Sequence, residues 1–234
     1  MAHSIENLNY FGDTCWKVPL TNHLLDIYFM TLHLDILPDN QRGLLPHFIS
    51  LRDTWYLAGD TALALQIGHR ESVDFDFFCE KSFDTAELFR HLVSVLPDCQ
   101  KDFEEDNTLY ITSHSVKCSF ITYEYPLITD CIQTPSLRLA WLPDIAAMKL
   151  SAIQQRSTQK DYIDLYFLLK QYFLKELLDF YSQKFGATTN PILIRKYLTF
   201  FDDIMPVDIP LHSDVSWSEI QAEIVEKATQ FEDA

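Results

Sequence analysis

The fold of this 234-residue chain is decided by the stretch Tyr56-Leu-Ala-Gly-Asp-Thr-Ala-Leu-Ala-Leu-Gln-Ile-Gly-His-Arg-Glu-Ser-Val-Asp-Phe-Asp-Phe-Phe78. Its aromatic and apolar start predicts a short strand that ends at Ala58. Gly59 permits a tight turn because it has no Cβ, and a helix is expected over residues 62–67. Gly68 is placed to end that helix in a left-handed conformation. The stretch therefore predicts a strand, a turn and a short helix in direct succession.

The start of this helix is a candidate anion site. Asp60 or Thr61 is expected to cap the helix with its side-chain oxygen. The first N–H groups of a helix have no partner within the helix and carry a partial positive charge, so they favour a phosphate.

The next segment, residues 72–78, alternates between apolar and polar side chains, which predicts a strand. Ser72, Asp74 and Asp76 fall on one face of it, and Val73, Phe75 and Phe77 fall on the other. Two carboxylates at this spacing form a hard-oxygen site that suits Mg²⁺. An anion cradle beside such a pair is what nucleoside triphosphate chemistry requires. A solvated strand face is the alternative interpretation.

The rest of the chain predicts a small mixed sheet between helical flanks, an α/β fold. Hydrophobic spacing, proline, glycine and a capping box at Ser216–Glu219 define the expected elements. They are helices over 22–33, 44–52, 85–96, 144–156, 160–184 and 217–230, a turn over 38–43, and a hairpin formed by 109–112 and 116–123.

The charge balance narrows the classes of partner. Lys and Arg number 18 and Asp and Glu number 34, which gives a net charge of −16. Residues 202–234 hold nine acidic side chains and one lysine, so this segment alone carries −8. A protein this acidic repels a phosphate backbone, so duplex DNA is not an expected ligand. A basic partner, or a small phosphorylated ligand held together with a metal, remains compatible with the charge.

No segment approaches the roughly 18 to 20 apolar residues that cross a bilayer, and the N-terminus has no secretory pattern. We expect a soluble, cytoplasmic protein with no membrane partner. The five cysteines include no Cys-x-x-Cys pair, so they are interpreted as buried thiols in a reducing compartment.

Two parts of the sequence resemble the AbiEii/AbiGii toxin family of nucleotidyltransferases, within the DNA polymerase β-like superfamily. Leu57 to Phe77 is similar to the family pattern of a strand, Gly-Gly-Thr-Ala-Leu-Ala-Leu, and then Gly-His-Arg-x-Ser-x-Asp-x-Asp-Phe. Residues 144–156 and 160–166 resemble the family's lysine-bearing helix and its Lys/Arg-Asp-x-x-Asp-Leu-Tyr segment. Asp60 departs from the pattern, because it stands at the family's second glycine.

The resemblance implies a nucleotidyltransferase-type sheet flanked by helices. Together with the expected elements, which alone define the two ends of the chain, it suggests an N-terminal helical extension over 1–43, a nucleotidyltransferase-like core over 44–135 and a helical region with an acidic tail over 136–234. It also implies Mg²⁺-dependent transfer of a nucleoside monophosphate from an NTP, by the toxin of a toxin–antitoxin or phage-defence pair.

Site roles follow from the same resemblance. Asp74 and Asp76 would hold the metal, and Gly59 to Thr61, which includes Asp60, would cradle the triphosphate. Lys149 would contact its oxygens, together with Arg70. Asp161 would orient or deprotonate the acceptor.

Each role has a plainer alternative. Lys149 lies on a nearly apolar helix, where it is either a buried functional lysine or a snorkelling surface one. Arg70 is expected either to bind phosphate or to pair with Asp74 or Asp76. Asp161 can simply stabilise a first helical turn. Asp164 and His69 are expected to be structural.

Three functions for Asp60 are open: a helix cap turned away from the ligand, a member of the metal site, or a charge that weakens nucleotide binding. The family's acceptors include tRNA ends, but the net charge argues against unaided tRNA binding, so a protein acceptor is also open. A catalytically silent binding module is the alternative to the enzyme.

Overall fold

The computed structural model describes residues 15–17, 29–156, 158–186, 190–204 and 206–230. Its centre is a seven-stranded sheet in the order β5-β6-β7-β4-β3-β9-β8. The two central strands, β3 and β4, are antiparallel, whereas β4 pairs in parallel with β7 and β3 in parallel with β9. The strand bounds are Tyr56–Ala58 (β3), Asp74–Cys79 (β4), Gln100–Glu105 (β5), Thr108–Ser113 (β6), Val116–Thr122 (β7), Ile132–Gln133 (β8) and Arg138–Leu139 (β9). This mixed sheet with flanking helices confirms the predicted α/β class.

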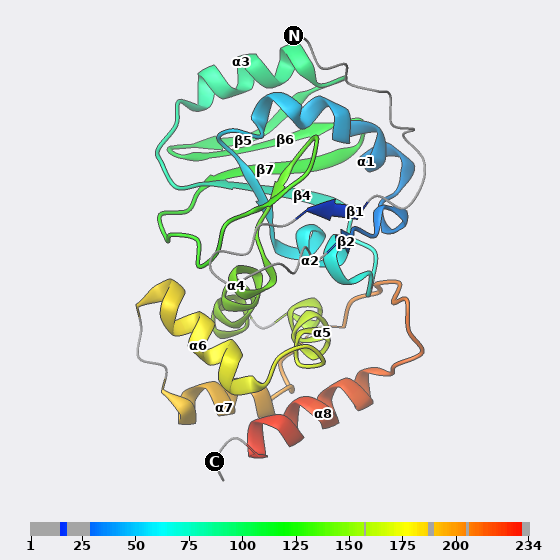
Figure 1. Cartoon of the computed structure of the whole chain (residues 1–234), viewed down its shortest axis with the longest axis vertical. Helices are drawn as coiled ribbons and strands as arrows, with labels where there is room; N and C mark the ends of the chain where they lie inside the picture. The colour runs from blue at the N-terminus through cyan, green and yellow to red at the C-terminus, as the bar shows by residue number, and fades with distance from the viewer. Residues whose placement is uncertain (1–14, 18–28, 157, 187–189, 205, 231–234) are drawn as a thin grey trace.

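The helices divide into two groups (Figure 1). α1 and α3 lie with the sheet in the upper half of the view, and α4 to α8 form the lower half. α2, α4 and α5 meet between the two halves. The helix bounds are Asp39–Leu44 (α1), Gly59–Ile67 (α2), Thr85–Val95 (α3), Leu142–Gln155 (α4), Gln159–Leu168 (α5), Leu174–Phe185 (α6), Pro191–Thr199 (α7) and Trp217–Gln230 (α8). Among the described residues, no helix is long and apolar enough to cross a membrane.

Aromatic side chains fill the core on one face of the sheet. Phe75 and Phe77 of β4 are buried, as the alternation predicts, whereas Val73, which precedes the strand, is exposed. Phe77 stacks on Phe120 of β7, with ring centroids 5.0 Å apart, and Phe48 meets Phe75 edge to face at 5.1 Å. Successive side chains of a strand point to opposite faces, so Asp74 and Asp76 lie on the face of β4 that points away from this aromatic core.

Several predicted elements are confirmed. The strand, turn and helix around Gly59 are present, and Gly68 ends α2 in the left-handed region with φ 66°. β6 and β7 form the expected hairpin. Ser216 and Glu219 form the expected capping box at the start of α8, since each accepts a hydrogen bond from the other's backbone N–H.

The prediction for the N-terminal part needs correction. Of the helix expected over 22–33, residues 22–28 lie outside the described part. Residues Phe29–Thr31 are a strand, β2, that pairs with β1 (Cys15–Lys17) in an antiparallel two-stranded sheet. Leu34–Ile36 is a 3₁₀ turn. A short apolar run fits either period, so its partner strand decides the structure.

Other boundaries also differ. The turn expected at 38–43 is α1, and the helix expected over 44–52 is a 3₁₀ helix, Leu45–Leu51. The long helix expected over 160–184 is broken between α5 and α6, where the Glu176 carboxylate accepts the Phe173 N–H at 2.8 Å and starts a new helix. β5 escaped prediction because all six of its residues are exposed, so it shows no apolar alternation.

Candidate active site between the sheet and the helices

Gly59 joins the sheet to α2 and brings the two predicted halves of the site together. It has a φ of +69°, and a Cβ placed on it would lie 3.2 Å from Oδ2 of Asp76. The backbone at the start of α2 therefore passes directly against a carboxylate of β4. Only a residue without a side chain suits both the turn and this contact.

Asp74 and Asp76 lie on the same face of β4, opposite the buried phenylalanines. Oδ1 of Asp76 accepts a hydrogen bond from Ser119 Oγ at 2.6 Å. Burial raises the pKa of Asp76, and the negative charges of Asp60 and Asp74 raise it further. Half-buried carboxylates that repel one another are electrostatically suited to a divalent cation, because the ion would relieve the repulsion.

The helix-cap prediction for Asp60 and Thr61 is wrong. α2 begins at Gly59, so both residues lie inside its first turn, and no side chain caps the helix. The Thr61 hydroxyl donates to the backbone carbonyl of Asp74 and lies 2.7 Å from Ser72 Oγ. Thr61 thus fastens α2 to the start of β4.

Asp60 faces cations. Its Oδ2 lies 3.1 Å from Arg70 Nη2 and 2.9 Å from Lys160 Nζ, and its Oδ1 accepts a hydrogen bond from Lys149 Nζ. Burial alone would raise the pKa of Asp60, but the charges of Lys149, Arg70 and Lys160 outweigh it and hold the pKa well below its ordinary range. Asp60 is therefore ionised and bound to three positive groups.

Lys149 is the centre of the cluster. Its side chain is 3 % exposed, which excludes the snorkelling interpretation. Its Nζ lies 3.0 Å from Oδ1 of Asp161 and 2.5 Å from Oδ2 of Asp164, in addition to its contact with Asp60. Burial would lower the pKa of Lys149, but the three carboxylates outweigh that effect and raise it. The lysine is thus charged and links α4 to both α2 and α5.

Asp164 anchors the segment that follows α2. Its carboxylate accepts two hydrogen bonds from Arg70, at 2.7 Å from Nε and 2.8 Å from Nη2. It also accepts one from His69 Nε2 at 2.7 Å. Burial lowers the pKa of His69, so the ring is neutral and its Nε2–H is the donor. These contacts confirm the structural interpretation of Asp164 and His69.

The prediction that Arg70 pairs with Asp74 or Asp76 is wrong, because its described partners are Asp164 and Asp60. The reason is the backbone of residues 69–71, which pairs with a distant segment. His212 N donates to His69 O at 2.9 Å, and Glu71 N donates to Pro210 O at 3.2 Å. The backbone on both sides of Arg70 is thus held by this segment, and the Arg70 side chain binds Asp164 of α5.

Asp161 accepts several further hydrogen bonds, from donors other than the Arg70 and His69 side chains that bind Asp164. Arg156 donates to it from Nε and Nη2, both at 3.1 Å, and the Thr158 hydroxyl donates at 2.5 Å. Burial would raise the pKa of Asp161, but Lys149 and these donors lower it. The side chains of Arg156 and Lys160 are partly exposed, so both are in contact with solvent. The sequence signal for Lys160 was its place beside Asp161 in the family-like segment.

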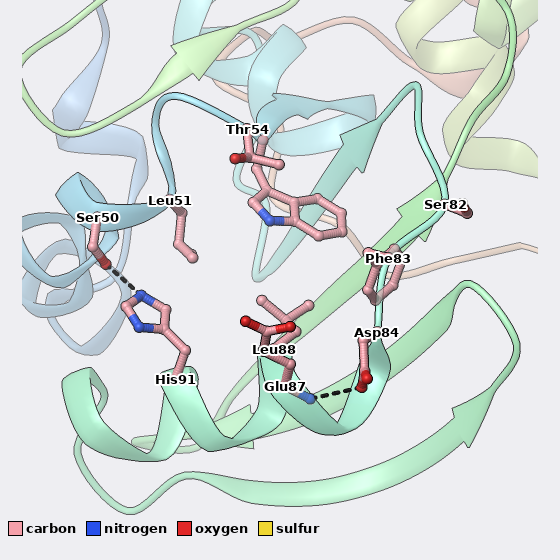
Figure 2. Close-up of a pocket in the computed structure, with 10 residues that line it drawn as sticks. Ser50, Leu51, Thr54, Ser82, Phe83, Asp84, Glu87, Leu88 and His91 are labelled. Atoms are coloured by element: carbon pink, nitrogen blue, oxygen red, sulfur yellow. Dashed lines mark hydrogen bonds between the residues drawn. The ribbon is translucent and has the colours of Figure 1, made fainter.

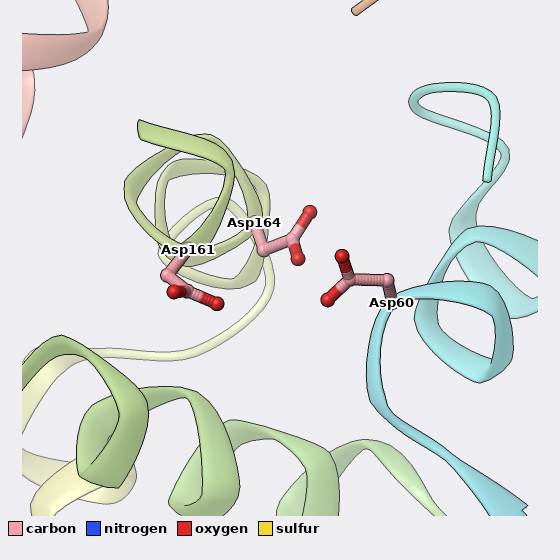
Figure 3. Close-up of side chains that lie close together, drawn as sticks. All are labelled: Asp60, Asp161 and Asp164. Carbon is pink, nitrogen blue, oxygen red and sulfur yellow. The ribbon is translucent and has the colours of Figure 1, made fainter. Parts of the chain in front are cut away.

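Asp60, Asp161 and Asp164 bring carboxylate oxygens within 4.8 Å of one another (Figure 3). Asp161 and Asp164 project from α5, and Asp60 faces Asp164 from the start of α2. Lys149 contacts all three carboxylates, and Arg70, Arg156 and Lys160 pair with them as well, so the charges of this triad are already matched by side-chain cations. Asp74 and Asp76 are therefore the better match to a metal ion.

A separate cavity of about 440 Å³ lies at the other end of β3 (Figure 2). Leu51, Trp55 and Leu88 contribute apolar surface to it, and Ser50 bonds His91 at 2.9 Å on one side. None of the predicted site residues lines it.

The sequence matches the family model described as nucleotidyl transferase AbiEii toxin, type IV TA system, over residues 44–125 and 111–234. The chain belongs to the AbiEii family. This membership makes it a nucleotidyltransferase of a toxin family. An uncharacterized protein of Aquifex aeolicus (strain VF5) is 33 % identical over 205 residues, which cover 83 % of this chain and 97 % of that protein.

Solved structures agree on the fold. MenT4, a nucleotidyltransferase toxin from Mycobacterium tuberculosis, superposes with a TM-score of 0.58 at 14 % identity, over 83 % of this chain and 82 % of that chain. JHP933 from Helicobacter pylori superposes with a TM-score of 0.51 at 22 % identity, over 83 % of this chain and 89 % of that chain. At these identities the likeness supports the nucleotidyltransferase fold.

Proposed function

We propose that this AbiEii family member transfers a nucleoside monophosphate from an NTP to an acceptor hydroxyl and releases pyrophosphate. The observation that carries the proposal is the meeting of Asp76 with the Gly59 turn, beside a cluster of buried and half-buried cations. Carboxylates for a metal and cations for a polyphosphate thus share one site, which is what this reaction needs.

In this proposal the acceptor oxygen bonds to the α-phosphorus, and the bond between the α-phosphorus and its bridging oxygen to the β-phosphate breaks. Asp74 and Asp76 would hold Mg²⁺. When bound there, Mg²⁺ would make the acceptor hydroxyl more acidic and neutralise charge on the leaving group.

The protein's own groups would position the reactants. The backbone of Gly59 to Thr61 would cradle the triphosphate, and Lys149 and Arg70 would contact its oxygens. Asp161 would orient the acceptor hydroxyl or take its proton. Its strong hydrogen bonds to Arg156 and Thr158 favour the orienting role, because they stabilise its ionised form.

The acceptor is a tRNA end or a protein hydroxyl, and the biological setting is the toxin of a toxin–antitoxin or phage-defence pair with a cognate antitoxin protein. The net charge of −16 favours the protein acceptor, because unaided tRNA binding needs basic surface.

The test is incubation of the purified protein with each labelled NTP, Mg²⁺ and a cell extract. Label is expected in macromolecules, and its loss after nuclease or protease treatment identifies RNA or protein as the acceptor. A lack of transfer with all four NTPs contradicts the proposal. That outcome favours the silent binding module, for which the neutralisation of Lys149 by three carboxylates is the supporting observation.

A further inference from the structure

Asp60 differs from the other two carboxylates that contact Lys149. The side chains of Asp161 and Asp164 are fully buried, whereas that of Asp60 is 13 % exposed. Asp60 sits in the first turn of α2, where free N–H groups also favour an anion. Of the three carboxylates, that of Asp60 is therefore the most accessible to solvent.

Lys149 and Arg70, two of the three cations that contact Asp60, also have other carboxylate partners. Lys149 keeps Asp161 and Asp164 as partners, and Arg70 keeps its two hydrogen bonds to Asp164. Lys160, which is 34 % exposed, can follow a ligand toward solvent. The Asp60 carboxylate can thus leave without stranding a buried charge, as long as another anion takes its place.

The balance of charges in the cluster favours the replacement of the Asp60 carboxylate by another anion. Lys149, Arg70, Lys160 and Arg156 carry four positive charges against three from Asp60, Asp161 and Asp164. Without the Asp60 charge, the carboxylates in ion-pair contact with these cations would be Asp161 and Asp164 alone among the described residues. Carboxylate and phosphate oxygens accept the same kind of charged hydrogen bond from Lys and Arg, so one can substitute for the other.

We propose that Asp60 is an internal anion that stands where a substrate phosphate binds, and that a polyphosphate displaces its carboxylate from Lys149, Arg70 and Lys160. The inference rests on the proposed function for the identity of the phosphate donor. Asp60 thereby sets nucleotide affinity: it weakens binding, and it keeps the cations paired when no nucleotide is present.

Calorimetric titration with inorganic tripolyphosphate, without a nucleobase or transfer, tests this directly. Asp60→Asn keeps the shape of the side chain and removes its charge, and it is expected to tighten binding roughly 5- to 30-fold. Glu105→Gln on the exposed strand β5 changes the net charge equally and is expected to leave the affinity within about twofold of wild type. Asp60→Asn is also expected to melt at a lower temperature than wild type, and saturating tripolyphosphate is expected to close that gap.

Equal or weaker binding by Asp60→Asn overturns the inference. If that variant does not fold, the wild type supplies the measurement: saturating tripolyphosphate is expected to move the ¹³C resonance of the Asp60 carboxyl, and an unmoved resonance overturns the inference. Failure of the proposed function is a separate outcome. Tighter tripolyphosphate binding without NTP labelling keeps Asp60 as the internal anion and rejects the proposed transfer reaction, whereas labelling without tighter binding does the reverse.

Discussion

The ammonium nitrogen of Lys149 lies 2.5 Å from Oδ2 of Asp164, and neither side chain is more than 3 % exposed. The pair joins α4 to α5. Because Asp164 also binds Arg70 and His69, it connects both helices to the segment that follows α2. The residues that hold the helical half against the sheet therefore include those proposed to bind substrate, so stability and site geometry depend on the same charges.

Asp164→Asn is expected to cost about 3–5 kcal/mol of unfolding free energy, because it leaves Lys149 and Arg70 buried with one carboxylate fewer. Urea unfolding followed by circular dichroism measures the loss. Glu223→Gln is the matched control, since it breaks the more exposed pair with Lys170, at 2.5 Å, and is expected to cost less than about 1 kcal/mol. Similar losses in the two variants would contradict a buried anchoring role.

The same carboxylate predicts an acid dependence. Burial alone would raise the pKa of Asp164, but Lys149 and Arg70 outweigh it and hold the pKa below its ordinary range. The folded state therefore favours the ionised form, and this contribution to stability is complete above the unfolded pKa of about 3.9 and is lost as the pH falls toward the folded pKa. The difference in unfolding free energy between wild type and Asp164→Asn should shrink as the pH is lowered from 5 to 3. A difference that stays constant or grows would show that the charge of Asp164 is not the cause.

Three glycines allow backbone strain to be separated from the contact with Asp76. Gly186 has a φ of +61°, and no atom of the described residues lies within 4 Å of an added Cβ, so Gly186→Ala is expected to cost about 1–2 kcal/mol from strain. Gly59→Ala combines similar strain with a Cβ 3.2 Å from Asp76 Oδ2, so it is expected to cost more. Gly43, in α1, has an open Cβ position, and Gly43→Ala is expected to be neutral or to stabilise by up to about 1 kcal/mol. Thermal and urea unfolding measure the loss of stability in the three variants. A loss for Gly59→Ala no larger than that for Gly186→Ala would mean that the Asp76 side chain moves away from the added Cβ at no energetic cost.

The parts of the fold that the sequence predicts well are those whose partners are close in the chain. The turn at Gly59 and the hairpin of β6 and β7 depend on local geometry, so glycine placement and alternation were sufficient. β2 and β5 were missed because one is decided by a partner strand and the other is an exposed edge strand. Hydrophobic periodicity reveals neither a partner strand that is distant in the sequence nor a strand whose residues are all exposed.

The site shows the same limit. Asp74 and Asp76 are two residues apart on a strand, so the sequence alone predicts that they share a face. The spacing of residues in the sequence does not predict the ion-pair partner of Arg70. Asp74 and Asp76 stand within six residues of Arg70, yet its carboxylate partners are Asp60 and Asp164, and Asp164 is 94 residues away in the sequence. Residues 69–71 also pair with the distant segment 210–212, and neither long-range contact can be read from local spacing.

Asp76→Ala is expected to abolish NTP-dependent labelling while the melting temperature stays nearly unchanged or rises. The activity should be lost because Asp76 is one of the two proposed metal ligands and lies against the Gly59 turn. The stability should be kept because the pKa of Asp76 is raised by burial and by the charges of Asp60 and Asp74. A raised pKa means that the ionised form is disfavoured in the folded state, so at neutral pH removal of the charge relieves repulsion.

The control for this change is Glu105→Ala, which removes one exposed carboxylate from β5 and is expected to leave both labelling and melting temperature at wild-type values. Asp76→Asn separates the two effects, since its side-chain oxygen can still accept the Ser119 hydrogen bond. It should therefore melt at or above the temperature of Asp76→Ala and transfer as little label. Transfer by Asp76→Asn at the wild-type rate would remove Asp76 from the reaction, and a fall in melting temperature of several degrees in both variants would assign it a structural role instead.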